Sequence, residues 1–305
     1  MSGREEQDLQ REQWIQNKLN NQPEIMQDYM LSIKKKTSST RVAYLRYIIE
    51  FTNFMNENDI DIYKAQPRHM DRYIAHISSG RGNDIVNAKL SAIFSFYKFL
   101  IKNKLVSECP IDKDMRLERN NDKDVIYLTE DEVRKVKVRT VTNTKHSTRN
   151  LCIITLGCAT GLRVSAIRNI DIEDINFEDK SIRVIEKGNK ERLIYIEDNT
   201  IKIIKDWMKE REEKFGTNSG PLFLSQKRTR LSVRTIEEMI HNVSIEVDKH
   251  ITPHKMRSTC AMKLYGLTGD IYLTAQQLGH KNISTTMIYA KAKDDKRREA
   301  ATLLD

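Results

Sequence analysis

The sequence lacks the features that mark several large classes of protein. It has four cysteines in 305 residues and no C-x-x-C pair, so neither a disulfide framework nor a thiolate zinc site is indicated. No apolar run approaches the roughly 18 residues that a membrane-spanning helix needs. The segment Met1–Gln10 is acidic and polar, unlike a signal peptide, and there is no fixed-period repeat or low-complexity tract. We therefore expect a cytoplasmic protein with no membrane partner.

Positive charge is what the chain has in excess. Lysine and arginine total 52 against 43 acidic residues, a formal net charge of +9. Hydrophobic residues make up 39% and charged residues 31%, as in ordered, soluble proteins. Residues 31–105 hold 13 basic and 6 acidic side chains, whereas residues 1–30 hold 3 and 6. This basic block favours a polyanionic partner without identifying it.

The apolar pattern divides the chain into two domains. Apolar residues recur at three- and four-residue steps over 41–51 and 90–100, which predicts a small basic helical bundle. The rhythm stops between Val106 and Asp124, where Pro110 and charges of both signs predict a linker. We expect a polar N-terminal extension (1–21), a helical domain (22–105), a linker (106–125), a second domain (126–292) and a C-terminal tail (293–305).

The second domain is predicted to be mainly α with a small β-hairpin. Thr129 and Glu132 have the spacing of a capping box and start its first helix. Two β-branched runs, 181–186 and 192–196, flank a turn with Gly188, so Lys187 and Lys190 would lie at a hairpin tip. Further helices are expected at 147–158, 162–169, 199–215, 232–247, 253–265, 270–278 and 284–292. The acidic run at 171–179 fits a solvated face better than a metal site.

Two predicted helix starts carry cations, which the helix dipole disfavours. Thr252 and Pro253 begin one helix, on which His254 and Arg257 lie three residues apart on one face. Arg163 falls in the first turn of another. Cations at these positions make sense if an anion binds there. The alternative is that the arginines pair with local carboxylates and that His254 is a satisfied cap-region residue.

A last motif lies near the C-terminus. Gly279 is predicted to end a helix just before His280, and Ser284 to cap a short helix that holds Tyr289. Taken alone, this tyrosine fits a core or rim position. The order in which all these motifs occur changes that interpretation.

Together the motifs resemble those of the tyrosine recombinase family, the phage-integrase and Xer-like enzymes. The matching residues are Ala159-Thr160-Gly161-Leu162-Arg163, Glu186-Lys187-Gly188-Asn189-Lys190-Glu191-Arg192, His254-x-x-Arg257, and Leu278-Gly279-His280 with Tyr289. Residues 22–105 resemble that family's helical, SAM-like core-binding domain and residues 126–292 its α+β catalytic domain. The sequence departs from the family pattern at Ala166, where an acidic residue is frequent, and near Ser258 and Cys260.

The resemblance implies a site-specific DNA recombinase or integrase. It would cleave and rejoin DNA through a covalent 3′-phosphotyrosyl intermediate and a Holliday junction, with no metal, cofactor or ATP. Tyr289 would attack the phosphate, Arg163, Arg257 and His280 would bind its non-bridging oxygens, His254 would be the general acid/base, and Lys187 would protonate the leaving 5′ oxygen. The chemistry suits these residue types, because in-line attack builds negative charge on the equatorial oxygens and requires both a base and an acid.

The implied partner is double-stranded DNA, on which the protein would assemble as a homo-tetramer across paired sites. Accessory proteins that set the direction of recombination are compatible with this assembly. The protein would be cytoplasmic and DNA-associated, and its tail could dock on a neighbouring protomer or pack at home. Phosphate contacts are expected from Lys34, Lys35, Lys36, Arg41, Arg81 and Lys89, with Lys190 as an accessory contact; for any one of them a solvated face is the alternative.

Two other functions remain open. One is a DNA-binding protein that kept the scaffold but not catalysis, and the other is a type IB topoisomerase-like enzyme. The recombinase interpretation requires Tyr289 to be within reach of the clustered cations. It would fail if the phenol were permanently buried behind hydrophobic packing.

Overall fold

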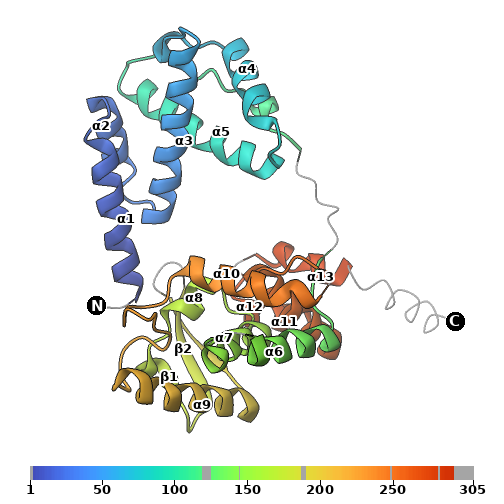
Figure 1. Ribbon diagram of the computed structural model, residues 1–305. Coiled ribbons are helices and arrows are strands. Elements are labelled where there is room, and N and C mark those ends of the chain that lie inside the picture. The colour runs from blue at the N-terminus through green and yellow to red at the C-terminus, as the bar shows by residue number, and fades with distance from the viewer. Residues whose placement is uncertain are drawn as a thin grey trace, which may run out of the picture. The chain divides into compact units, whose positions relative to one another are not determined.

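The computed structural model describes residues 3–118, 125–143, 145–186, 190–247, 249–280 and 282–291. The chain folds into two compact units, Gly3–Lys123 and Asp124–Asp305. Helices predominate and the strands form one small sheet (Figure 1), which confirms the predicted mainly α fold. None of the helices in the described part of the chain has the length and apolar character that crossing a bilayer requires.

The first unit is a helical bundle. Its helices are α1 (Gly3–Leu19), α2 (Glu24–Ser32), α3 (Ser38–Glu57), α4 (Pro67–Ser78) and α5 (Asn83–Lys102), with 3-10 turns at Ile62–Lys64 and Lys113–Met115. The long helices α3 and α5 pack on each other, α1 packs on α3, and α2 and α4 pack on α5. Aromatic rings fill the core edge to face, as where Phe51 meets Tyr73 with centroids 5.2 Å apart.

Residues 3–21 are not the separate polar extension that was predicted for residues 1–21. Most of them form α1, which packs on α3 and buries Ile15 and Leu19 in the core of the first unit. Glu12 of the same helix is paired with Arg41 of α3, with 2.6 Å between the carboxylate and guanidinium atoms. The prediction was wrong because α1 has few apolar residues among many polar ones, so the sequence pattern does not reveal the face that is buried.

The second unit is built around one central helix. Its helices are α6 (Glu130–Asn143), α7 (Ser147–Thr160), α8 (Val164–Asn169), α9 (Asp198–Phe215), α10 (Val233–Val243), α11 (Pro253–Thr268), α12 (Ile271–Leu278) and α13 (Met287–Lys291), with 3-10 turns at Ile172–Asp174, Ser244–Glu246 and Ile283–Thr285. The central helix is α7, which contacts α6, α8, α9, α10 and α11. It is buried along most of its length, so its C-terminal end is held firmly in place.

The sheet is antiparallel in the order β1 (Ile175–Asn176), β2 (Ser181–Glu186) and β3 (Lys190–Tyr195). The predicted hairpin is confirmed in β2 and β3; the two-residue β1 is too short to have been predicted. Acidic side chains of the run at 171–179 brace this region instead of forming a merely solvated face. Asp174 pairs with Arg183 of β2 at 2.8 Å, and Asp171 pairs with the buried Arg230 at 2.6 Å.

Helix starts follow the sequence closely, with one exception. The capping box before α6 is confirmed: the Thr129 N–H donates to Glu132 Oε2 at 2.7 Å, and the Glu132 N–H donates to Thr129 Oγ1 at 3.3 Å. Thr252 caps α11 as predicted. The prediction for Ser284 is wrong, because Ser284 lies inside the 3-10 turn Ile283–Thr285 and the helix that holds Tyr289 begins only at Met287. The cap of that 3-10 turn is Asn282, whose side chain accepts the Ser284 N–H at 2.9 Å.

Gly161 ends α7 at a point where a side chain would not fit. Its φ of +65° lies in the left-handed region, and an added Cβ would meet Leu278 Cδ2 at 2.7 Å and Cys260 Sγ at 3.2 Å. The end of α7 can therefore lie close against both α11 and the last residue of α12. This close approach brings together the chain segments that carry the predicted catalytic residues.

Candidate active site

Arg257 connects two segments of the chain that are far apart in sequence. It lies on α11, and its residue surface is 3% exposed. Its Nη1 donates to the carbonyl oxygen of Gly161 at 2.7 Å, and its Nη2 donates to the carbonyl oxygen of Leu278 at 2.5 Å. Gly161 lies two residues before Arg163, and Leu278 lies two residues before His280. The buried guanidinium of Arg257 therefore fixes the backbone next to two other predicted site residues, Arg163 and His280.

Four of the six predicted catalytic residues come together around this point. Arg163 is the exposed residue that caps the start of α8, and His254 is the exposed second residue of α11. His280 follows the left-handed Gly279 that ends α12. Desolvation, together with the charges of Arg257, Lys255 and Arg163, lowers the pKa of His254. The predicted cluster of cations therefore exists, and it favours an uncharged His254 in the absence of an anion.

The ring of His280 is held by a buried hydroxyl. Its Nδ1 is 2.7 Å from Oγ1 of Thr286, a residue with no exposed surface. Burial lowers the pKa of His280 to about 4, with further contributions from Arg257, Arg163, His254 and Arg192. The imidazole is therefore neutral at neutral pH, and it can carry a proton on one nitrogen while accepting at the other.

Tyr289 is covered in this conformation. It lies on α13 with 1% of its surface exposed, in an apolar cluster with Ala261, Met262 and Leu278. Val125 and Tyr127, at the start of the second unit, pack against the same cluster. The phenol of Tyr289 is therefore buried behind hydrophobic packing in this conformation, the arrangement that the recombinase interpretation excludes if it is permanent.

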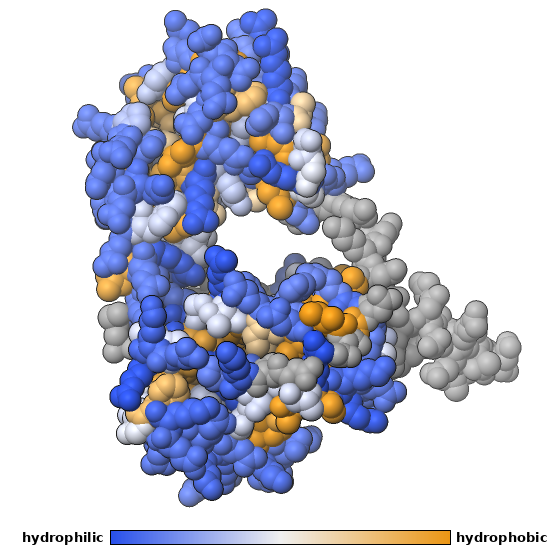
Figure 2. All heavy atoms as spheres, viewed as in Figure 1, coloured by the Kyte–Doolittle hydropathy of each residue, from blue (hydrophilic) through white to orange (hydrophobic). Residues whose placement is uncertain are grey.

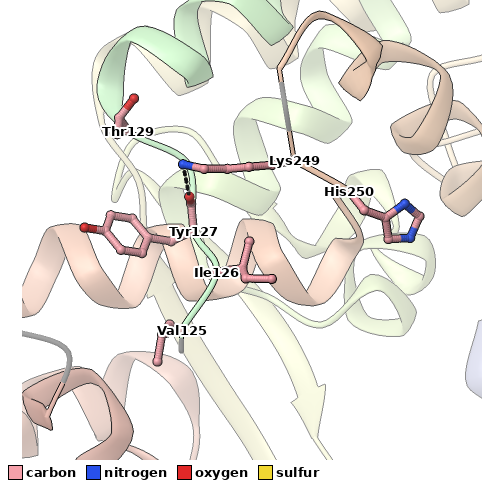
Figure 3. Close-up of a pocket in the computed structure, with 6 residues that line it drawn as sticks. All are labelled: Val125, Ile126, Tyr127, Thr129, Lys249 and His250. Carbon is pink, nitrogen blue, oxygen red and sulfur yellow. Dashed lines mark hydrogen bonds between the residues drawn. The ribbon is translucent and has the colours of Figure 1, made fainter. Parts of the chain in front are cut away.

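The segment that covers Tyr289 also borders a cavity of about 430 Å³. Figure 3 shows the residues that line it: Val125, Ile126, Tyr127, Thr129, Lys249 and His250. The Lys249 ammonium reaches across to this segment and donates to the Tyr127 carbonyl oxygen at 3.1 Å (Figure 3) and to Glu132 Oε2 at 2.8 Å. The start of the second unit is thus anchored by a lysine on one side and by apolar packing on the other.

A larger cavity of about 940 Å³ is lined by α6, α7, α11, α12 and the segment from the end of β3 to the start of α9. Its apolar lining includes Val133, Met262 and Leu273, and Leu267 at its border is 76% exposed. Neither this cavity nor the smaller one is lined by the four clustered residues or by Tyr289. Of the four clustered residues, Arg163 and His254 are exposed, whereas Arg257 is buried beneath them.

Several predicted residues lie outside the described part of the chain. These are Lys187, the side chain of Lys190 and the tail 293–305. Their predicted roles stay predictions.

Sequence reasoning missed three polar side chains that hold the site together. Thr286 binds the ring of His280, Gln277 Nε2 donates to the Thr160 carbonyl oxygen at 3.1 Å, and Arg192 donates to the end of α12. Only Arg192 carried a signal, since it closes the hairpin motif. The other two act through contacts that the fold creates and that no local pattern reveals.

The basic residues of the first unit divide into exposed and buried ones. Lys34, Lys35 and Lys36 are exposed, and hydrophilic side chains cover most of the face of each unit seen in Figure 2. Lys89, by contrast, is buried and its ammonium lies 2.5 and 2.6 Å from the two carboxylate oxygens of Glu50. This ion pair argues against the predicted phosphate contact by Lys89.

The two remaining predicted contacts are also engaged. Arg81 donates to Glu50 at 3.1 Å and stays partly exposed. Arg41 has only 14% of its side chain exposed and is paired with Glu12. A phosphate would have to compete with these carboxylates, so Lys34, Lys35 and Lys36 are the better candidates.

Comparison with known proteins gives a consistent result for both units. The phage integrase family matches residues 127–296, and the phage integrase N-terminal SAM-like domain matches residues 27–104. The chain is 31% identical over 300 residues to tyrosine recombinase XerC of Caldanaerobacter subterraneus, covering 90% of this chain and 83% of that protein. It is 31% identical over 276 residues to tyrosine recombinase XerA of Pyrococcus horikoshii, covering 88% and 89%.

Solved structures share the fold. A crystal structure of XerA recombinase superposes with a TM-score of 0.52 at 25% identity, covering 92% of this chain and 97% of that one. A XerH site-specific recombinase in a post-cleavage complex with its palindromic difH substrate gives a TM-score of 0.74 at 19% identity, covering 94% and 87%. The SAM-like assignment of the first unit is thereby confirmed along with the α+β second unit.

His280 should remain neutral well below pH 6. Its folded pKa is about 4 against 6.5 for an unperturbed imidazole. Between these values the unfolded chain binds more protons than the folded one, so His280 lowers the free energy of unfolding as pH falls from about 7 toward 4. Titration of the ring resonances by NMR checks the pKa, and urea unfolding of His280→Gln should show a smaller loss of stability over that range. A measured pKa of 6 or above would contradict the electrostatics described.

Proposed function

Because the chain belongs to the phage integrase family of tyrosine recombinases, we propose that it cleaves and rejoins duplex DNA at a specific site through a 3′-phosphotyrosyl intermediate and a Holliday junction. The observation that carries this proposal is the gathering of Arg163, His254, Arg257 and His280 at the ends of α7 and α12 and the start of α11. Such a cluster of donors suits a phosphodiester.

The proposed first step is an in-line displacement at phosphorus. The Tyr289 phenol oxygen forms a bond to the phosphorus as the bond from phosphorus to the 5′ oxygen breaks. The phenol proton leaves to a base, for which His254 is the candidate, and the 5′ oxygen takes up a proton from Lys187. The product is a phosphotyrosyl ester and a free 5′-hydroxyl. Since one phosphodiester replaces another, a second 5′-hydroxyl can reverse the step without ATP.

The arginines and His280 would stabilise the charge that builds on the non-bridging oxygens. The guanidinium of Arg163 matches a pair of phosphate oxygens. If the Thr286 hydroxyl donates to Nδ1 of His280, the neutral ring carries its proton on Nε2 and can donate it to phosphate. The low pKa of His280 supports this arrangement, because a neutral ring has to keep one nitrogen as an acceptor.

DNA binding would have to uncover Tyr289. Exposing a buried ring costs on the order of 2 kcal/mol, whereas a micromolar complex supplies about 8 kcal/mol of binding free energy. The short helix α13, only five residues long, is the segment that would move. Covering the phenol in the free protein would confine cleavage to the assembled complex.

We further propose that the protein acts in the cytoplasm as a homo-tetramer on paired DNA sites. Exposed Lys34, Lys35 and Lys36, and Lys190 of the hairpin, are the proposed backbone contacts. The apolar cavity beside α11 and α12 could receive the amphipathic tail 293–305 of a neighbouring copy. Accessory proteins that set direction would act on this assembly.

Tyr289→Phe should bind DNA but form no covalent adduct. Phenylalanine keeps the ring in its apolar cluster and removes only the nucleophilic oxygen. The substrate is a nicked duplex carrying a site recovered by repeated binding selection from random DNA, and adducts are counted on a denaturing gel. Tyr272→Phe is the matched control: Tyr272 is 70% exposed on α12, and its loss should leave adduct formation unchanged.

Other outcomes would assign a different function. If Tyr289→Phe still forms adducts and Tyr272→Phe does not, the nucleophile is Tyr272 and not Tyr289. Tight binding with no adduct in the unaltered protein would indicate a DNA-binding scaffold without catalysis. Relaxation of supercoils by a monomer would indicate a topoisomerase-like enzyme.

Replacing Lys34, Lys35 and Lys36 together by Gln should weaken DNA binding and its dependence on salt. Each lost phosphate contact lowers the slope of log affinity against log salt by about 0.9, so the triple variant should lose up to about 3. The control replaces three exposed lysines of α9: Lys202, Lys205 and Lys209. If both triple variants change the slope equally, the lysines of the first unit make no specific phosphate contact.

A further inference from the structure

Arg192 stands on the inward face of the hairpin. It lies on β3 opposite Val184 of β2, two residues before the buried Ile194. Side chains two apart on a strand share one face, so Arg192 points to the same side as the core residue. A guanidinium placed there must find strong acceptors, because burial of an unsatisfied charge is costly.

The acceptors it finds are the last carbonyls of α12. Nη1 of Arg192 donates to the carbonyl oxygen of Gln276 at 2.9 Å and to that of Gln277 at 2.7 Å. The carbonyl oxygen of Gln276 also accepts the Gly279 N–H at 3.0 Å. Carbonyls in the last turn of a helix carry partial negative charge, so a cation is well placed there. These bonds join the hairpin to α12, across more than 80 residues of sequence.

Arg192 and Arg257 together hold three successive carbonyls. Arg257 takes that of Leu278, directly after the two bound by Arg192. The next residue is Gly279, and His280 follows. The backbone that leads into His280 is therefore set by two guanidinium groups, one on the hairpin and one on α11.

We propose that Arg192 is a positioning residue for phosphoryl transfer: by fixing the last turn of α12 against β3, it holds His280 where the non-bridging oxygens of the phosphate will lie. This proposal rests on the role given to His280 under the proposed function. Arg192 itself touches backbone and not the reacting atoms. The charge of Arg192 also contributes to the low pKa of His280.

Loss of Arg192 can impair cleavage by two routes. The hairpin that bears Arg192 also bears Lys187, the proposed proton donor to the leaving oxygen. If Arg192 acted by placing Lys187, its loss would impair leaving-group protonation. If it acts by placing His280, its loss impairs stabilisation of the phosphate oxygens and leaves protonation intact.

A DNA substrate with sulfur in place of the bridging 5′ oxygen distinguishes these routes. A thiolate leaves without being protonated, so this substrate restores cleavage when only the proton donor is defective. The experiment measures single-turnover adduct formation on the oxygen and sulfur versions of the selected duplex, together with duplex affinity. The variants are Arg192→Gln, Arg192→Lys and, as the matched control, Arg183→Gln. Arg183 is an exposed hairpin arginine whose partners are Asp174 and Glu191.

Arg192→Gln should slow cleavage about 100-fold, the cost typical of a small misplacement of a catalytic group, with duplex affinity within a few-fold of the unaltered protein. The sulfur substrate should not restore the rate. Arg192→Lys, which keeps the charge and can still donate to a carbonyl, should lose less. Arg183→Gln should cleave normally.

Three results would overturn the proposal. They are a cleavage rate for Arg192→Gln within about threefold of the unaltered protein, full recovery on the sulfur substrate, and a loss confined to duplex affinity. If Arg192→Gln does not give a cooperative thermal transition, the same criteria apply to Arg192→Lys. Failure of the proposed function is seen separately, as DNA binding by the unaltered protein with no covalent adduct.

Discussion

The site depends on one buried guanidinium that bonds to two main-chain carbonyls. Arg257 joins the end of α7 at Gly161 to the end of α12 at Leu278. A buried arginine is tolerated only when its donors are satisfied, and carbonyls at helix ends are suitable acceptors because they lack helical partners. The left-handed Gly161 makes the approach possible, since any side chain there would strike Leu278 and Cys260. From this junction Arg163 and His280 extend on either side.

The clustered positive charge is unfavourable in the absence of an anion, and the histidines reflect this. Both His254 and His280 have lowered pKa values, because burial disfavours their charged forms and because the neighbouring arginines add to this effect. A bound phosphate would relieve that repulsion. Relief of the repulsion would therefore add to the free energy with which the cluster binds a DNA phosphate under the proposed function. Tyr289, the proposed nucleophile, is instead packed in an apolar cluster. Under the proposed function, the groups that would bind phosphate are gathered before DNA binds, whereas the group that would attack it is still covered.

The sequence allowed the local parts of this arrangement to be predicted, but not the long-range ones. Helix caps at Thr129 and Thr252 and the hairpin of β2 and β3 follow from neighbouring residues, and the structure has them. The cluster of Arg163, His254, Arg257 and His280 followed from the resemblance to a family.

Burial and pairing across the fold could not be predicted in this way. Lys89 looks like any surface lysine until α5 packs on α3 and brings it to Glu50. The covered Tyr289 and the inward Arg192 depend in the same way on contacts that only the folded chain creates. The helix α1 was not predicted as part of the first unit because few apolar residues lie on its buried face.

The central claim is that the fork of Arg257, and not merely its charge, assembles the site. Single-turnover adduct formation by Arg257→Lys tests it most directly, with the amide resonances of Gly161 and Gly279 followed by NMR in the same variant. Lysine keeps the charge but cannot span both carbonyls, so cleavage should fall by about 100-fold or more and both resonances should shift together. Cleavage at close to the unaltered rate, with both amides unmoved, would contradict the account.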